Sequence, residues 1–157
     1  MKTRGARRPR AARVVILIWL ATTLVASGQD RGSGQRALSS IKQLKCSFRT
    51  ATTGNWQSGE PQVRVTELKN ALGFTIADID STDGIATMTR SEGASSVTVQ
   101  LSGSNLYFLD VRTSGATLTT VFSQESQPGR LKAVHTQTEP NLAHYYGDCE
   151  ILEVSAR

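Results

Sequence analysis

The sequence predicts an all-β domain: a single antiparallel meander of about eight strands, closed into a barrel. Between residues 96 and 136, four runs rich in β-branched and aromatic residues alternate with three turn signals, a pattern typical of short antiparallel strands. No long stretch has helical periodicity. The two cysteines, Cys46 and Cys149, fall in the first and last clear strands. A bond between them would place the two ends of the meander side by side, which a closed barrel requires. A sandwich with neighbouring terminal strands would meet the same requirement.

The first 28 residues have the three-part order of a secretory signal peptide. A basic segment up to Arg13 precedes an apolar run of 13 residues, Val14–Ala26, which is followed by Ser27 and Gly28. A membrane-spanning helix needs roughly 20 apolar residues, so cleavage is favoured over the alternative of an uncleaved anchor. We therefore expect a signal peptide at 1–28, a flexible spacer at 29–43 and a barrel domain at 44–154. The protein would be exported to the periplasm or the cell exterior.

Removing this leader changes the charge of the protein. The whole chain carries 18 basic and 13 acidic residues, a net charge of +5, but six of the basic residues and none of the acidic ones precede residue 30. The remaining 12 basic and 13 acidic residues give a net charge of −1. The basic character thus belongs to targeting, and no nucleic-acid partner is predicted, because such binding needs a basic face on the folded domain.

The compartment also decides how the cysteines are interpreted. Disulfides form and persist in oxidising compartments outside the cytosol. Because Cys46 and Cys149 are the only cysteines, we expect them to be bonded to each other. Two buried thiols are the alternative. No histidine or further cysteine stands at ligand spacing from either one, so no metal site is predicted.

The individual strands follow from period-two alternation of apolar and polar residues, which marks half-buried strands. Residues 37–44 are read either as a short helical turn or as the lead-in to the first strand, and Thr52–Pro61 as a loop that carries Trp56. Tight turns are expected at Asp83-Gly84 and Glu92-Gly93. The expected strands are Leu44–Ala51, Gln62–Thr66, Leu72–Asp80, Ile85–Arg90, Val97–Leu101, Leu106–Val111, Ala116–Phe122, Leu131–Thr136 and Tyr145–Val154.

Several segments together carry a family resemblance. The order LYFLDV, LTTVF, LKAVHT and YYGDCE, with KCSF near the start, resembles small exported bacterial β-barrel proteins of uncharacterised function, with a calycin-like architecture. The resemblance covers roughly residues 44–152 and implies a fold rather than a chemistry. Many lipocalins open on Gly-x-Trp, whereas the nearest candidate here, Gly54-Asn55-Trp56, follows the first strand. The resemblance therefore implies no lipocalin-type ligand.

One acidic run invites a metal interpretation. Asp78, Asp80 and Asp83 precede Gly84, and three carboxylates within six residues could collect Ca²⁺, which prefers oxygen ligands. The spacing does not match an EF-hand loop. We therefore favour a hairpin with an Asp-Gly turn flanked by solvated acids.

His135, Tyr145 and Trp56 are candidates for contacts with a ligand, and Asp110 could join His135 and Tyr145 in proton transfer. His135 alternates with Leu131 and Ala133, so it should face the interior, and Tyr145 and Asp110 stand in phase with apolar neighbours. Together such groups could transfer protons at neutral pH. The structural alternative is a hydrogen-bonded histidine and a tyrosine at the barrel mouth. Trp56 is the only tryptophan outside the leader, and it either stacks on a ligand or partner or closes one end of the barrel.

The sequence therefore predicts an exported, non-catalytic binding or interaction domain without a cofactor. Its partner would be a small apolar ligand or an envelope protein. Two alternatives remain: a small barrel enzyme of the isomerase or cyclase type that uses His135 and Tyr145, and a structural envelope protein. The barrel interior separates these, because an eight-stranded barrel either holds one small ligand or is filled by its own side chains.

Overall fold

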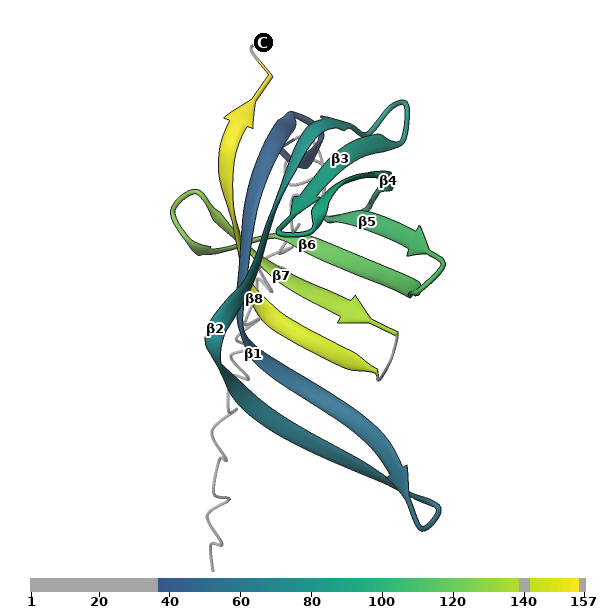
Figure 1. The fold of residues 1–157 in the computed structure, drawn as a ribbon. Helices are drawn as coiled ribbons and strands as arrows, with labels where there is room; N and C mark the ends of the chain where they lie inside the picture. The colour runs from purple at the N-terminus through teal and green to yellow at the C-terminus, as the bar shows by residue number, and fades with distance from the viewer. Residues whose placement is uncertain (1–36, 139–141, 156–157) are drawn as a thin grey trace, which may run out of the picture.

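The computed structural model describes residues 37–138 and 142–155, and it shows one closed antiparallel barrel in which each strand pairs with its neighbour in sequence and the last pairs with the first. Closure leaves the barrel wall itself without free edges. Figure 1 shows the barrel with one hairpin reaching well beyond it. The strands are β1 (Ile41–Gln57), β2 (Glu60–Asp80), β3 (Ile85–Arg90), β4 (Gly93–Ser102), β5 (Asn105–Arg112), β6 (Gly115–Gln127), β7 (Arg130–Gln137) and β8 (Ala143–Val154).

The disulfide closes the barrel where the sequence predicted. Cys46 on β1 and Cys149 on β8 are direct register partners, and their Sγ atoms lie 2.01 Å apart. Both side chains are buried, so the bond is part of the core as well as a link between the first and last strands. A stable disulfide fits an oxidising compartment.

Side chains fill the barrel interior. Buried apolar residues from all eight strands form one cluster, in which Phe48 and Phe108 are the largest fully buried side chains. This packing follows from the sequence, because strict alternation along β5 and β7 turns every second residue inward. Leu38, in a helical turn at residues 37–39, belongs to the same core cluster and packs under the end of the barrel at which β1 begins. The first strand then begins at Ile41, three residues before the predicted start.

The predicted loop at Thr52–Pro61 is wrong. These residues continue β1 to Gln57, turn at Ser58-Gly59, and return as β2. The predicted strands Gln62–Thr66 and Leu72–Asp80 are consequently parts of the one strand β2. Both turn residues have positive φ, 54° and 83°, as a tight two-residue hairpin requires. The threonines at 52 and 53 favour strand structure, and pairing with Val65 and Arg64 fixes it.

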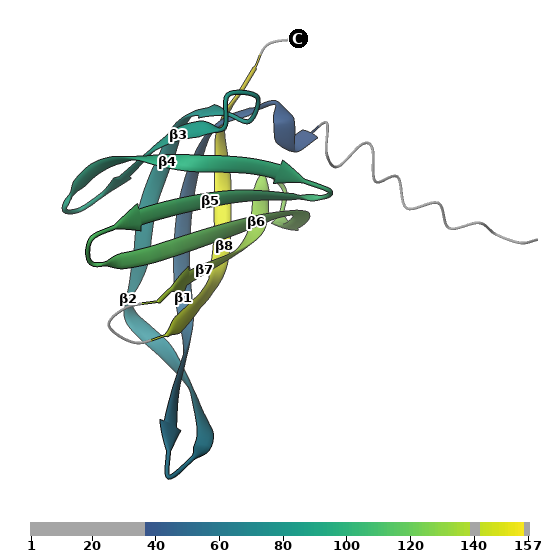
Figure 2. The same cartoon turned by 90° about the vertical axis from the view of Figure 1, so that its right-hand side faces the viewer.

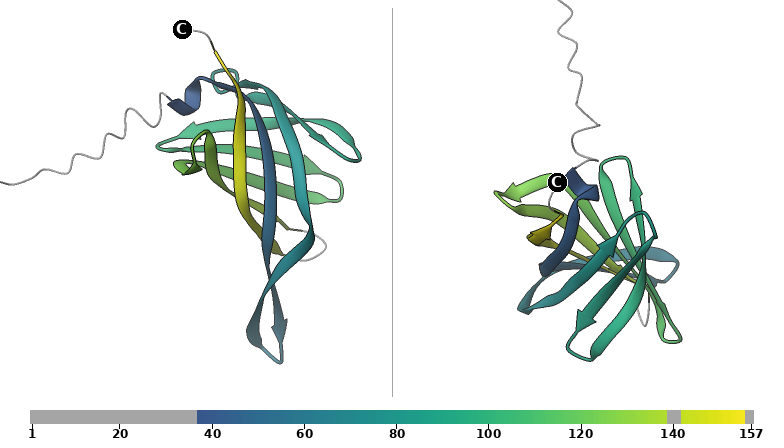
Figure 3. Two further views of the ribbon diagram at one scale, coloured as in Figure 1. Left: turned by 90° about the vertical axis from the view of Figure 1, so that its left-hand side faces the viewer. Right: turned by 90° about the horizontal axis from the view of Figure 1, so that it is seen from above.

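We call the protruding hairpin (residues 50–71) the arm. It projects from the end of the barrel opposite the chain's carboxyl end, as Figures 1 and 2 show. Figure 3 shows β8, β1 and β2 side by side, with β1 and β2 alone continuing into the arm. At its base β2 contains a bulge. Phe48 pairs with Leu72, whereas Thr50 pairs with Glu67. Between these two pairs β2 advances by five residues and β1 by only two. A bulge bends a strand, and this one tilts the arm away from the barrel.

The predicted leader (residues 1–28) and most of the predicted spacer lie outside the described residues. Among the residues that are described, no helix is long and apolar enough to cross a membrane.

Candidate functional site

Two of the predicted site residues meet at a small hollow in the barrel mouth, at the end from which the arm projects. The hollow has a volume of about 180 Å³, and its lining includes Arg90, Asp110, Arg112 and His135. These side chains come from β3, β5 and β7. Their inward direction confirms the predictions made for Asp110 and His135 from alternation.

Asp110 is held by two arginines. Its Oδ2 accepts hydrogen bonds from Nη1 of Arg90 at 2.6 Å and from Nε of Arg112 at 2.9 Å. Burial raises the pKa of Asp110, but the hydrogen bonds and charges of both arginines outweigh burial and leave the pKa below its ordinary value. Arg90 also donates to Thr117 at 3.1 Å and lies over the ring of Phe74. Asp110 is therefore ionised, and its bond to Arg90 links β5 to β3. The two arginines balance its negative charge.

His135 is an uncharged buried imidazole. Its side chain is only 3% exposed, and Nδ1 shares a hydrogen bond of 2.8 Å with the hydroxyl of buried Thr119. Burial lowers its pKa to about 4, and the charge of Arg90 adds to this effect, while Asp110 opposes it. The rings of Phe48 and Phe74 lie 5.7 and 5.1 Å away. At neutral pH the imidazole carries no charge, and it can donate a hydrogen bond through one ring nitrogen and accept one through the other.

Tyr145 stands beside His135. The two are register partners on β8 and β7, with ring centroids 6.0 Å apart. The structure thus brings together His135 and Tyr145, but Trp56 is absent from this group. Trp56 lies in the arm and is 77% exposed, so it does not close the barrel end. It stands near the tip of a hairpin that projects past the mouth.

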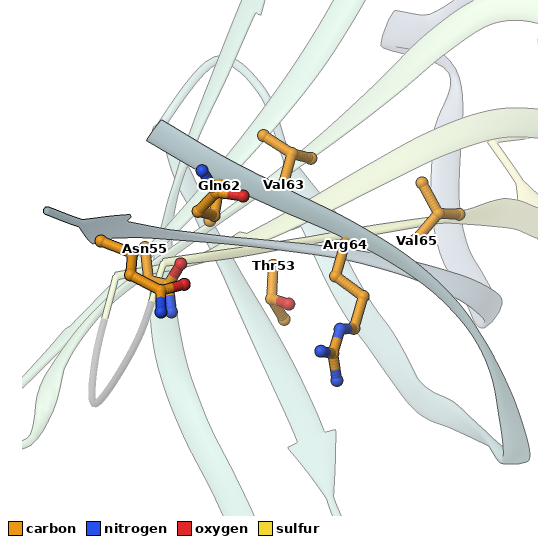
Figure 4. Close-up of a pocket in the computed structure, with 8 residues that line it drawn as sticks. Thr53, Asn55, Gln62, Val63, Arg64 and Val65 are labelled. Carbon is orange, nitrogen blue, oxygen red and sulfur yellow. The ribbon is translucent and has the colours of Figure 1, made fainter. Parts of the chain in front are cut away.

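The arm has an apolar and a polar face. Strand alternation puts Trp56, Pro61, Val63 and Val65 on the outer face, and Val63 and Val65 are 72% and 67% exposed. In Figure 4, Val63 and Val65 point to one side of β2, whereas Arg64 and Thr53 point to the other. An open groove of about 690 Å³ runs along these residues. It is larger than the mouth hollow, but none of the described residues that line it is a buried titratable group.

The outer face extends onto the neighbouring strand. Gly54 lies between Val63 of β2 and Leu142, because its N–H donates to the Leu142 carbonyl at 3.3 Å. Leu142 and Tyr146 are exposed as well. The result is an exposed, largely apolar surface across three adjacent segments, of the kind that marks interaction sites.

One edge of the arm is unpaired. β2 pairs with β3 only from Thr75 onward, so within the described part of the chain its outer edge from Glu60 to Phe74 faces no strand. The backbone orientation follows from Gly54, whose N–H points to Leu142 and therefore away from β2. Its partner Val63 must likewise turn its N–H and C=O outward, and alternation gives Val65 and Glu67 the same orientation.

The acidic run forms a turn, as favoured above. Oδ1 of Asp80 accepts the backbone N–H groups of Thr82 and Asp83 at 2.8 and 3.0 Å. These bonds are the main cause of the lowered pKa of Asp80. The carboxylate thereby stabilises the hairpin between β2 and β3.

Sequence reasoning missed the arginine pair around Asp110 and the free edge of β2. Arg90 and Arg112 both pair with Asp110. Alternation along one strand cannot specify that Arg90, on another strand, reaches this carboxylate. The arm did leave a signal, since Val63 and Val65 alternate with polar residues in the predicted strand Gln62–Thr66 and therefore share one face. Comparison with known proteins finds no matching family model, no matching curated protein and no matching solved structure.

Proposed function

We propose that this chain is an exported, non-catalytic interaction domain and that it binds a polypeptide partner through the arm. The single observation that carries the proposal is the unpaired edge of β2 beside the exposed apolar face of Trp56, Val63 and Val65. Free edges are templates for an added strand, and native proteins usually shield them with charge, proline or a bulge. Here the outer face keeps hydrophobic side chains beside the open edge.

Export is part of the proposal. It is supported by the basic, apolar and small-residue order of the first 28 residues and by the buried Cys46–Cys149 bond. A periplasmic or extracellular envelope protein is the class of partner that this location offers. The resemblance to small exported calycin-like barrels is supported by the up-and-down order of the closed sheet.

The mouth supports a second candidate, the binding of a small ligand. His135 and Arg112 border a hollow of about 180 Å³, and because a cavity of about 150 Å³ can hold benzene, it has room for one small ligand. The enzyme alternative is less well supported, because a general base works best with a pKa near the working pH, and the pKa of His135 is lowered to about 4. A neutral imidazole next to Tyr145 suits hydrogen bonding to a ligand better than proton abstraction.

The proposal is tested by photo-crosslinking in the exporting host. A photoreactive phenylalanine analogue replaces Trp56 in one variant and Val111 in the other. Val111 is a matched control, because it is 71% exposed and lies on the barrel wall. We expect protein adducts from position 56 and few from position 111. Equal yields from both positions, or none from position 56, would contradict the proposal.

A further inference from the structure

We propose that the partner strand at the β2 edge is the same edge of a second copy of this chain, paired antiparallel about a two-fold axis at Val65. The inference rests on the proposed function and names its partner. Only a short length of β2 is open to pairing, because the two ends of the unpaired edge are blocked in different ways.

The open window covers residues 62–67. Toward the tip the window ends at Pro61. This residue pairs with Trp56, so its backbone nitrogen lies on the open edge, but proline has no N–H to donate there. Toward the barrel it ends at the bulge of residues 68–71, where β2 loses register with β1. Proline and bulges are the usual means of blocking an edge. Only Val63, Val65 and Glu67 are left to present outward N–H and C=O groups.

This window is symmetric about its middle residue. With Val65 opposite Val65 of the second copy, Val63 of each chain faces Glu67 of the other. All outward groups of the window then find partners, in about six inter-chain hydrogen bonds. A two-fold interface uses the same patch on both subunits. The three outward residues meet this condition, because the middle one, Val65, lies on the axis and pairs with its own copy.

Neighbouring registers fit less well. Centring the pair on Arg64 would place two guanidinium groups opposite each other, and like charges in that position are unfavourable. Centring it on Thr66 would push Val63 against the bulge at Lys69. The register at Val65 avoids both, and Glu67 keeps its 2.8 Å bond from the Thr50 hydroxyl.

The charge of the arm permits self-association. Its four ionisable residues are Glu60, Arg64, Glu67 and Lys69, so the signs balance. The outer face from Thr52 to Val65 carries no charge, and Val65, at the centre of the proposed contact, is 67% exposed in the single chain. Two arms would therefore meet without net repulsion and would cover apolar surface on each.

The register is tested by cysteine crosslinking of the purified, leader-free protein. In Val65→Cys the two new cysteines would have Cα atoms about 5.5 Å apart, within disulfide reach. In the control Val63→Cys, on the same face, they would be more than about 13 Å apart. We expect mild oxidation to give a covalent dimer with Cys at 65 and a monomer with Cys at 63. Equal dimer yields, or none from position 65, would overturn the inference.

Sedimentation without any crosslink gives the second measurement. We expect the unmodified protein to form dimers and Val65→Lys to weaken them by about tenfold or more, since two ammonium groups would then face each other. The matched change Val111→Lys should leave dimerisation unchanged. A monomer at all concentrations would overturn the second-copy inference. If the protein is monomeric but position 56 still crosslinks to another protein in the host, the interaction proposal stands and only the second-copy inference fails. If the protein is monomeric and position 56 gives no adducts, both proposals fail.

Discussion

His135 shows how a single buried side chain sets the character of the barrel mouth. Its imidazole lies among aromatic rings and shares its Nδ1 with Thr119. The low pKa of about 4 follows first from burial, because a low-dielectric surrounding disfavours the charged form. The residue that looked most like a catalytic base therefore stays neutral over most of the physiological pH range.

The first prediction concerns the pH dependence of stability. In the folded protein the pKa of His135 is about 4, below the ordinary value of about 6.5 for an unfolded histidine. The unfolded state thus binds more protons between these values, so the free energy of unfolding should fall as pH drops from about 6.5 to about 4. His135 contributes up to about 3 kcal/mol to that fall.

The variant His135→Leu isolates this contribution. At pH 7 it should lower the free energy of unfolding by about 1–3 kcal/mol, because the Thr119 hydroxyl is left without its partner. Between pH 6.5 and 4 its stability should depend less on pH than that of the parent. Urea unfolding followed by circular dichroism measures both effects. Parallel pH profiles for the two proteins would show that His135 does not titrate in this way.

The second prediction concerns close backbone contact in the core. Gly147 on β8 faces the bulge in β1, and a Cβ placed on it would lie 2.7 Å from Cα of Phe48. Gly147→Ala must therefore move backbone, and we expect a loss of at least about 1–3 kcal/mol in unfolding free energy. Gly54→Ala is the control, since its nearest neighbour would be 4.0 Å away. Thermal unfolding compares the two, and a tolerated alanine at 147 would contradict the close register of β1 and β8.

At the scale of elements, the sequence predicted best where a strand has one buried face. The alternation along β5 and β7 correctly placed Phe108, Asp110 and His135 inside. The same signal failed at Thr52–Pro61, because the arm stands outside the barrel and has no buried face to impose an apolar period. In this segment of β1 the strand structure comes from pairing with β2, which the sequence of Thr52–Pro61 does not show by itself.

The candidate site was predictable only in part for a related reason. Inward direction is local, so His135 and Tyr145 could be chosen from their neighbours. Which charges meet Asp110 depends on the register of β3 against β4 and β5. That register depends on turn geometry and long-range pairing, and single-strand periodicity carries no information on it.

The third prediction is that the arm contributes little to the stability of the barrel. Trp56 is 77% exposed, so Trp56→Ser should change the unfolding free energy by no more than about 0.5 kcal/mol. The buried aromatic Phe108 gives the contrast, where Phe108→Ala should cost about 3–5 kcal/mol. Chemical denaturation measures both. A large loss at position 56 would mean that the arm packs on the barrel and is not free to bind.

At the scale of the whole molecule, the protein divides into a closed scaffold and one projecting element. The scaffold has a filled interior and a disulfide between its terminal strands. The arm begins where β1 and β2 extend beyond the ends of the other strands. This division separates the residues that set stability from those that we propose bind a partner.

The fourth prediction concerns the disulfide, which spans 103 residues of sequence. Closing so long a loop restricts the unfolded chain, and by the chain-entropy account this is worth up to about 4.7 kcal/mol. The double variant Cys46→Ala/Cys149→Ala should therefore be less stable by about 2–4 kcal/mol, with barrel structure retained where it still folds. Urea midpoints under non-reducing conditions decide this. An unchanged midpoint would mean that the bond adds nothing to the closure already provided by strand pairing.

The central claim, that the β2 edge is free in the single chain and covered on assembly, is tested most directly by amide hydrogen exchange. In dilute protein, the amides of Val63, Val65 and Glu67 should exchange rapidly, because they point away from β1. Those of Gln62, Arg64 and Thr66 should be protected, because they point toward it. Raising the protein concentration should then protect the first three. Protection of Val63, Val65 and Glu67 already at high dilution would contradict the account, since the edge would then be covered within one chain.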